Sequence, residues 1–464
     1  MGNLCGFIPV ATGSFAALAL SLWLWLTPPA HFEERVPGTD NRPPLVEATG
    51  KLTGTLTQGE GQPAKLPGSW PRFRGADLSN VCRDETPLAR SWGEGGPKVL
   101  WSLDLGEGYA GAAIRDGRVY VLDYDPAHAP PGDALRCLSL ADGREIWRYE
   151  YPVKIKRNHG MSRTVPTVTE KYVVAVGPKC HVTCLDALTG EKRWAKDLVR
   201  EFKATVPQWY AGQCPLVDGE HVILGVGGDK ALLMALKLAD GEVAWTTPNP
   251  DRWKMTHSSV VPMEFKGRRL YVYCASGGVA GVSAEKGELL WKTSEWKISF
   301  ATVPTPVIIG EGRLFLTGGY NAGSLILQLK EGNGTIEVQQ VLRLKPKEFD
   351  SPQHTPILFE NCLYAVRSDG QLACADLGGK VVWESGSGHK FGLGPYLIAN
   401  GLLFVMNDTG VLSLVEATSV GYKPLAQAKV FDKGHDAWGP MAIAGGRLIL
   451  RDLTRMACLD VRSQ

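Results

Sequence analysis

Cys184-Leu-Asp-Ala-Leu-Thr-Gly190-Glu-Lys-Arg-Trp194 decides the fold, because the same eleven-residue pattern recurs along the chain. Gapless copies, each with Gly at the seventh position and Trp at the eleventh, span 137–147, 235–245 and 281–291. Looser copies keep the glycine at positions 334, 379 and 421. The seven glycines follow one another after 47, 51, 46, 47, 45 and 42 residues. This regular spacing indicates an internal structural repeat.

The start of each unit repeats as well, as a turn followed by an apolar run. The first is Asp116-Gly117 before Val119–Leu122, and the eighth is Gly445-Gly446 before Leu448–Leu450. Each unit contains short apolar strands joined by Gly-containing hairpins. Four strands in a unit of about 40–50 residues are typical of a β-propeller blade. We therefore predict an all-β fold, an eight-bladed β-propeller over 70–464.

The eighth unit lacks an outer strand after Asp460, whereas Val99–Leu103 is a surplus strand ahead of the first unit. We expect the strand around Trp101 to complete the eighth blade. Strands from both termini would then close the ring and leave no unpaired edge between the ends.

The N-terminal residues 1–30 carry no charged side chain, and 7–26 are mostly apolar, which is long enough to span a bilayer as a helix. An uncleaved membrane anchor is the preferred interpretation, and a cleaved signal is the alternative. Both export the rest of the chain, and the anchor places it on the periplasmic or extracytoplasmic side of the inner membrane. Residues 31–69, rich in Thr, Pro, Gly and charge, are predicted to be a flexible tether.

Composition excludes some partners and sites. Lys and Arg (50) nearly balance Asp and Glu (48), for a net charge of +2, so nucleic acid is not an expected partner. No adjacent cysteines and no Cys-x-x-Cys occur. Cys137, Cys184, Cys374 and Cys458 share one repeat position that also accepts Ala or Gly, so we expect small buried thiols. No metal site is predicted.

The repeat resembles the tryptophan-docking repeats of the pyrroloquinoline quinone (PQQ) family of β-propellers. Trp70-Pro-Arg-Phe-Arg-Gly75 resembles the start of exported bacterial quinoprotein-like proteins in that family. The resemblance implies the fold, and two kinds of activity. The family includes quinoprotein alcohol dehydrogenases and also the non-enzymatic propeller lipoprotein of the outer-membrane assembly machine, which has no quinone.

The resemblance also implies that the repeat tryptophans pack blade against blade. A docking Trp buries roughly 150–250 Å² and has no catalytic role. The predicted structural residues are Trp101, Trp147, Trp194, Trp245, Trp291 and Trp383.

One set of residues points to a site. Several His, Trp and Arg side chains stand a few residues before the innermost strand of a blade, and such loops converge on one mouth of the central channel. Aromatic walls with imidazoles suit a sugar, a peptide or a flat cofactor; the alternative is a solvated rim whose histidines never meet. The candidate ligand-binding residues are His159, Arg163, Trp209, His257, His354, His435 and Trp438.

The preferred function is a non-catalytic, membrane-tethered module that binds an envelope protein, an extracellular polymer or a small ligand, without a cofactor. The alternative is a dehydrogenase of alcohols or sugars using PQQ with calcium. Against it, the vicinal cysteines of such enzymes are missing and no Glu, Asn and Asp trio stands at matching positions. A polysaccharide-active enzyme would need paired carboxylates at the mouth. No catalytic residue is identified.

Overall fold

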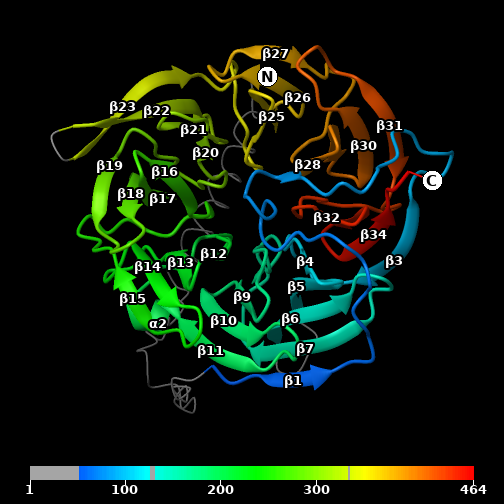
Figure 1. Ribbon diagram of the computed structural model, residues 1–464, viewed down its shortest axis with the longest axis horizontal. Helices are drawn as coiled ribbons and strands as arrows, with labels where there is room; N and C mark the ends of the chain where they lie inside the picture. The colour runs from blue at the N-terminus through cyan, green and yellow to red at the C-terminus, as the bar shows by residue number, and fades with distance from the viewer. Residues whose placement is uncertain (1–51, 126–130, 333–334, 464) are drawn as a thin grey trace, which may run out of the picture. The chain divides into compact units, whose positions relative to one another are not determined.

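Eight antiparallel sheets stand side by side around a ring in the computed structural model, which describes residues 52–125, 131–332 and 335–463 (Figure 1). This confirms the all-β, eight-bladed propeller. The predicted membrane segment, 1–30, lies outside the described residues, as does the tether up to residue 51. Within the described part, no helix is long and apolar enough to cross a membrane.

Each blade has four strands, which in the first seven blades pair in chain order from the innermost to the outermost. The blades, in order around the ring, are β4 (Ala113–Arg115), β5 (Arg118–Asp125), β6 (Gly132–Ser139) and β7 (Glu145–Pro152); β8 (Thr167–Val168), β9 (Tyr172–Val176), β10 (His181–Asp186) and β11 (Lys192–Asp197); β12 (Leu216–Asp218), β13 (His221–Gly225), β14 (Leu233–Lys237) and β15 (Val243–Thr246); β16 (Val261–Phe265), β17 (Arg268–Ala275), β18 (Gly278–Ser283) and β19 (Leu289–Thr293); β20 (Val307–Ile308), β21 (Arg313–Gly318), β22 (Gly323–Glu331) and β23 (Ile336–Leu344); β24 (Ile357–Phe359), β25 (Cys362–Val366), β26 (Leu372–Asp376) and β27 (Val381–Glu384); β28 (Tyr396–Ala399), β29 (Leu402–Met406), β30 (Val411–Glu416) and β31 (Pro424–Lys429); β32 (Ala442–Ala444), β33 (Arg447–Arg451), β34 (Arg455–Asp460) and β3 (Lys98–Asp104). A short helix, α2 (Leu198–Phe202), follows β11.

The last blade closes the ring with strands from both ends of the propeller. Strand β3 is its outer strand, and Trp101 pairs with Cys458 of β34. Cys458 pairs on its other side with Ile449 of β33. The predicted closure is therefore confirmed, and the fold ties its two ends through a seven-residue strand.

The Gly and Trp of the repeat meet across the boundary between neighbouring blades. Gly190 has φ +78°, and a Cβ there would lie 2.7 Å from the ring of Trp147 on the preceding blade. Gly241 stands in the same relation to Trp194, whose indole N–H donates to the carbonyl of Leu238 at 2.8 Å. The tryptophan ring thus lies flat on the hairpin, at a position where a Cβ on the glycine would clash with the ring. The same arrangement joins Trp101 to Gly143 and Trp245 to Gly287.

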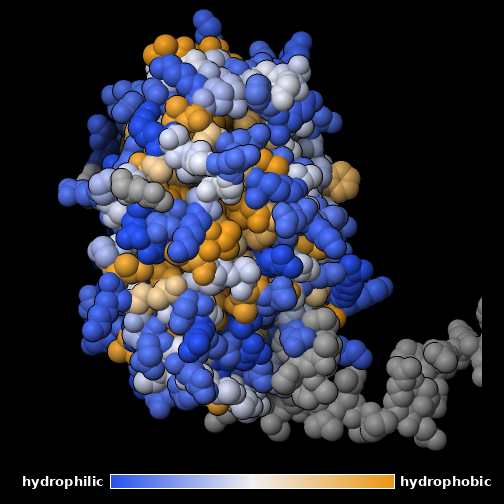
Figure 2. Space-filling model, turned by 90° about the vertical axis from the view of Figure 1, so that its right-hand side faces the viewer, coloured by the Kyte–Doolittle hydropathy of each residue, from blue (hydrophilic) through white to orange (hydrophobic). Residues whose placement is uncertain are grey.

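The core follows the same repeat. The repeat-position thiols at Cys137, Cys184, Cys374 and Cys458 are buried and free, as expected, and so are the other described cysteines. Most residues in the second and third strands of each blade are buried. On the side of the propeller shown in Figure 2, hydrophobic residues lie in small groups and short streaks between hydrophilic ones.

Ordered structure begins earlier than the sequence predicts. Strand β1 (Thr55–Gln58) lies within 31–69, the stretch expected to be a tether, and pairs antiparallel with β7. Thr57 pairs with Arg148, so the chain covers the outer edge of the first blade with a fifth strand. The short strand is polar and single-copy, and therefore carries neither a hydrophobic alternation nor a repeat that could reveal it.

Residues 70–82, which we call the plug segment, bond to the innermost strands of several blades near the centre of the ring (Figure 1). Trp70 exchanges backbone hydrogen bonds with Ile114 of β4, each 2.8 Å long. The guanidinium of Arg72 donates to the carbonyl of Val217 in β12. At the other end, β2 (Val81–Cys82) pairs in parallel with β28. The plug segment therefore spans the central channel.

Candidate functional site

The loops that lead into the innermost strands converge on one face of the ring, because adjacent antiparallel strands alternate in direction. There they enclose a cavity of about 440 Å³. The sequence-predicted residues that line it are His159, Arg163, Trp209, His257, His354 and Trp438.

His435 is the candidate that the structure does not bring to this cavity. Its side chain is 73% exposed, and its Nδ1 lies 3.4 Å from the Asp436 carboxylate. It stands in the loop before the eighth blade, as predicted, but it is not among the residues that line the pocket.

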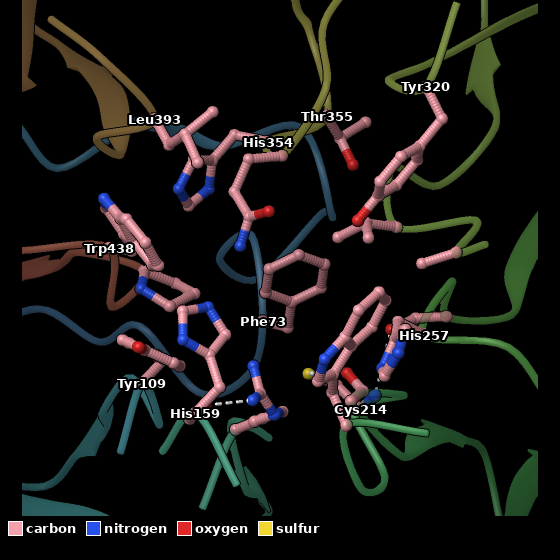
Figure 3. A pocket seen from close by; sticks show the side chains of 18 residues that line it. Phe73, Tyr109, His159, Cys214, His257, Tyr320, His354, Thr355, Leu393 and Trp438 are labelled. Atoms are coloured by element: carbon pink, nitrogen blue, oxygen red, sulfur yellow. Dashed lines mark hydrogen bonds between the residues drawn. The ribbon is translucent and has the colours of Figure 1, made fainter. Parts of the chain in front are cut away.

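Two aromatic groups face each other across the cavity (Figure 3). The first aromatic group consists of Tyr109, His159 and Trp438, whose ring centroids lie 5.2–5.6 Å apart. The second consists of Trp209, His257 and Tyr320. In it, Trp209 stacks on Tyr320 at 6.5 Å with an interplanar angle of 7°.

The plug segment supplies the phenyl ring between these groups. Phe73 lines the cavity and lies between the two groups in Figure 3. The next residue, Arg74, is buried and donates to the carbonyls of Thr355 and Pro356 at 2.8 and 3.0 Å. These bonds fix the neighbouring Phe73 in the central channel, where its phenyl ring forms an apolar floor of the pocket.

Arg163 is the cation of the pocket. Its Nη2 donates to the carbonyls of His159 and Gly160, and its guanidinium carbon lies 5.0 Å from the centre of the Tyr109 ring. Burial lowers the pKa of Arg163 to about 10, and the nearby tyrosines oppose this shift. The side chain therefore stays protonated at neutral pH.

Two imidazoles of the pocket stay neutral. Burial, assisted by the charge of Arg163, lowers the pKa of His257 to about 4. Burial and the charge of Arg74 likewise lower the pKa of His354 to about 4, against a hydrogen bond with the backbone of Leu393. Gly212 makes room for His257, because a Cβ there would lie 2.6 Å from its Nδ1.

Sequence reasoning missed three aromatic residues of the pocket. Tyr109 precedes the innermost strand of the first blade, the same position that identified Trp438, and could have been found by that rule. Tyr320 lies between β21 and β22, in a loop that reaches the same face because strands alternate. Phe73 belongs to a motif that the sequence indicated only as the start of the ordered region.

The described lining of the pocket does not fit the calcium ion of the enzymatic alternative. None of the described residues that line it is Asp or Glu. In 52–125, 131–332 and 335–463 no three His, Cys, Asp or Glu side chains are grouped to hold a metal ion. Calcium requires several oxygen ligands, most often carboxylates. Burial also raises the pKa of the Cys214 thiol at the wall to about 11, so it is not a thiolate nucleophile at neutral pH.

Comparison with solved structures agrees with the architecture. A europium-containing methanol dehydrogenase superimposes with a TM-score of 0.59 at 13% sequence identity, over 83% of this chain and 89% of that chain. At this identity the likeness shows a shared fold alone.

Curated relatives share one name. Outer membrane protein assembly factor BamB of Moranella endobia is 23% identical over 293 residues, which are 59% of this chain and 69% of that protein. The same factor of Shewanella oneidensis is 24% identical over 53% of this chain and 62% of its own length. The chain thus spans only part of each relative. The family model described as outer membrane protein assembly factor BamB matches residues 131–383, more than half of the chain. The chain therefore belongs to this BamB family of PQQ-like propeller repeats.

Proposed function

We propose that the protein is an exported propeller that serves as a non-catalytic scaffold in the assembly of outer-membrane proteins. The observation that carries this proposal is the family match over residues 131–383. The lining is consistent with it, because calcium binding calls on carboxylates and none of the described lining residues is Asp or Glu. Paired carboxylates for sugar hydrolysis are missing from the lining as well.

The N-terminal part of the proposal rests on the sequence. An uncharged stretch of 30 residues precedes the propeller, and its apolar run is long enough to span the inner membrane. We propose that this segment anchors the chain and leaves the propeller on the extracytoplasmic side, where an envelope protein can reach it.

The mouth of the channel is the proposed binding face. Aromatic and cationic side chains from most of the blades meet there, whereas the opposite loops are hairpins such as Ala141–Arg144, whose glycine serves the docking Trp. Concave sites with aromatic walls and few polar groups are the usual form of ligand pockets.

The test is made in the organism that encodes the protein. Deletion of the gene should lower the fraction of folded outer-membrane barrels, measured by their heat-dependent electrophoretic mobility. The full chain should restore that fraction, and a chain without residues 1–30 should be lost from the membrane fraction. Unchanged barrel folding after deletion would contradict the scaffold role, and membrane retention without 1–30 would contradict the anchor.

A further inference from the structure

Strand β23 leaves a long edge open on the circumference of the ring. It has nine residues and is the longest outermost strand of the eight blades. Among the described strands it pairs with β22 alone, so alternate backbone N–H and C=O groups face away from the sheet. The side chains of 339–343 are exposed, and 338–342 carry no charge. An uncharged edge of this length is a template for pairing with another strand.

The other outermost strands are protected against such pairing. Four of the six residues of β11 are charged. Strands β15 and β27 have only four residues each, β19 has five, and β31 begins with Pro424. Strand β3 has seven, with Lys98 and Asp104 at its ends. Short length, charge and proline all discourage strand addition. Strand β23 is longer than each of these and has neither charge nor proline between Glu337 and Arg343.

The chain itself shows that an outer blade edge accepts a further strand. Strand β7, with eight residues the second longest of the outermost strands, is covered by β1, which runs along its outside (Figure 1). The pairing extends from Thr55 opposite Glu150 to Gln58 opposite Trp147. Three of the four side chains of β1 are exposed. Backbone hydrogen bonds, rather than buried side chains, therefore hold most of this fifth strand in place.

The bulge in β23 does not prevent such pairing. A register shift leaves Ile146 as the extra residue of β7, and a shift at the same repeat position leaves Val341 as the extra residue of β23. The segment after β1 crosses the bulge of β7, since the N–H of Gly59 donates to the carbonyl of Ile146 at 2.8 Å. A Cβ on Gly59 would lie 2.0 Å from the carbonyl oxygen of Glu145. A strand that passes this bulge thus needs glycine there.

The exposed side chains of β23 favour an apolar neighbour. Val341 is 58% exposed and Leu342 is 37% exposed. Leu342 has the place in its blade that Trp147 has in the first blade, since each pairs with the last residue before the register shift. Leu56 of β1 packs against the core cluster that contains Trp147. An apolar side chain in the same position on β23 would remove the Leu342 side chain from water.

We propose that the outer edge of β23 binds an extended polypeptide segment of a partner protein as a fifth strand of the fifth blade. Main-chain hydrogen bonds would hold the segment, with an apolar side chain near Leu342 and a glycine at the bulge of Val341. None of the described residues that line the mouth cavity belongs to β23. The inference therefore names a second interaction surface and goes beyond the proposed scaffold role.

The probe is a fluorescent peptide that copies residues 54–61, Gly-Thr-Leu-Thr-Gln-Gly-Glu-Gly, added to the purified full chain. Fluorescence anisotropy should show saturable binding. The same peptide with methylated amide nitrogens on its Thr, Leu and Gln residues should bind about tenfold more weakly or less, because it has lost the N–H donors that pair with a strand edge.

Two matched variants locate the site. Val341→Lys should lower the peptide affinity about tenfold or more, since it places a charge on the edge. Val382→Lys is the control, because Val382 is the extra residue at the same bulge of the four-residue strand β27 and is 51% exposed. It should leave the affinity unchanged.

No saturable binding at millimolar peptide, or equal affinity of the plain and the methylated peptide for the wild-type chain, would overturn the proposal whether or not the variants fold. So would an unchanged affinity of Val341→Lys, which would mean that the peptide replaces β1 on β7. A dimer of the wild-type chain that Val341→Lys abolishes would assign the edge to a second copy instead. Normal barrel folding after gene deletion would contradict the scaffold role alone and leave peptide binding to β23 in place.

Discussion

Arg74 shows how one side chain can hold a single-copy segment in a repeat protein. It is 7% exposed, has φ +64°, and donates to the carbonyls of Leu78, Thr355 and Pro356 at 2.8–3.0 Å. Burial lowers its pKa to about 10, so it is a cation solvated by carbonyl dipoles. Its removal leaves these acceptors buried and unsatisfied.

Arg74→Met should therefore lower the free energy of unfolding by about 2–4 kcal/mol, the loss expected for hydrogen bonds to a buried charge. Urea unfolding measures it. Arg83→Ala is the matched control, because that guanidinium is 73% exposed and its ion pair with Asp77 should contribute about 1 kcal/mol or less. Equal effects of the two variants would show that the plug segment does not depend on Arg74.

Asp133 is a buried carboxyl with an unusual protonation state. It accepts from the Tyr151 hydroxyl at 2.6 Å and the Ser162 hydroxyl at 3.4 Å. Burial raises its pKa from 3.8 to about 7; the Tyr151 hydrogen bond opposes the shift and the charge of Asp123 adds to it. Between these values the folded chain holds a proton that the unfolded chain has lost, so this group costs stability as the pH rises from about 4 to 7.

The free energy of unfolding of Asp133→Asn minus that of the wild-type chain should therefore be more positive at pH 8 than at pH 5. The comparison of the two chains cancels the opposite contribution of His257 and His354, whose lowered pKa values favour folding as the pH rises. Denaturant unfolding at the two pH values gives the difference, and a difference that stays constant with pH would refute the raised pKa.

At the scale of the element, several blades are held by the tryptophan of a neighbouring blade, as Trp101, Trp147, Trp194 and Trp245 show. Trp194 is 7% exposed, lies on Gly241 and bonds to Leu238. Trp194→Ala should cost roughly 3–5 kcal/mol, as other large-to-small changes of buried aromatic residues do. Trp245→Ala is the comparison: that ring is half-buried and its N–H has no partner, so its loss should cost less. Thermal unfolding ranks them, and a reversed order would contradict the docking role.

The repeat explains why the blades could be predicted and two other elements could not. A pattern that recurs at regular spacing is unlikely to arise by chance, and the eight turns that precede an apolar run give the number of blades. Strand β1 and the plug segment occur once, and their positions depend on bonds to blades far away in the sequence, such as Asn80 to Tyr396. Local propensity carries no information on such pairings.

The same reasoning applies to the site. Its predicted residues share one topological position, so the ring brings six of them together without any contact being visible in the sequence. Whether a side chain then turns inward depends on the loop: His435 pairs with Asp436 and stays in solvent. The position of a residue in the repeat predicts the face of the ring on which it lies, whereas the direction of its side chain depends on contacts within its loop.

For the whole molecule, the ring is closed by β3 and crossed by residues 70–82, and the loops before the innermost strands form the mouth that holds the cavity. We therefore assign binding to the mouth and a structural role to the opposite hairpins. That assignment predicts different outcomes for substitutions of equal kind on the two faces.

The most direct measurement is complementation of the gene deletion, scored by the fraction of folded outer-membrane barrels. The full chain with Arg163→Gln and Trp209→Ala, which changes the mouth, should fail to restore that fraction at normal protein level. The full chain with Arg144→Gln and Lys286→Gln, on the opposite hairpins, should restore it completely. Full restoration by the mouth variant, or failure of the opposite-face variant alone, would contradict the account.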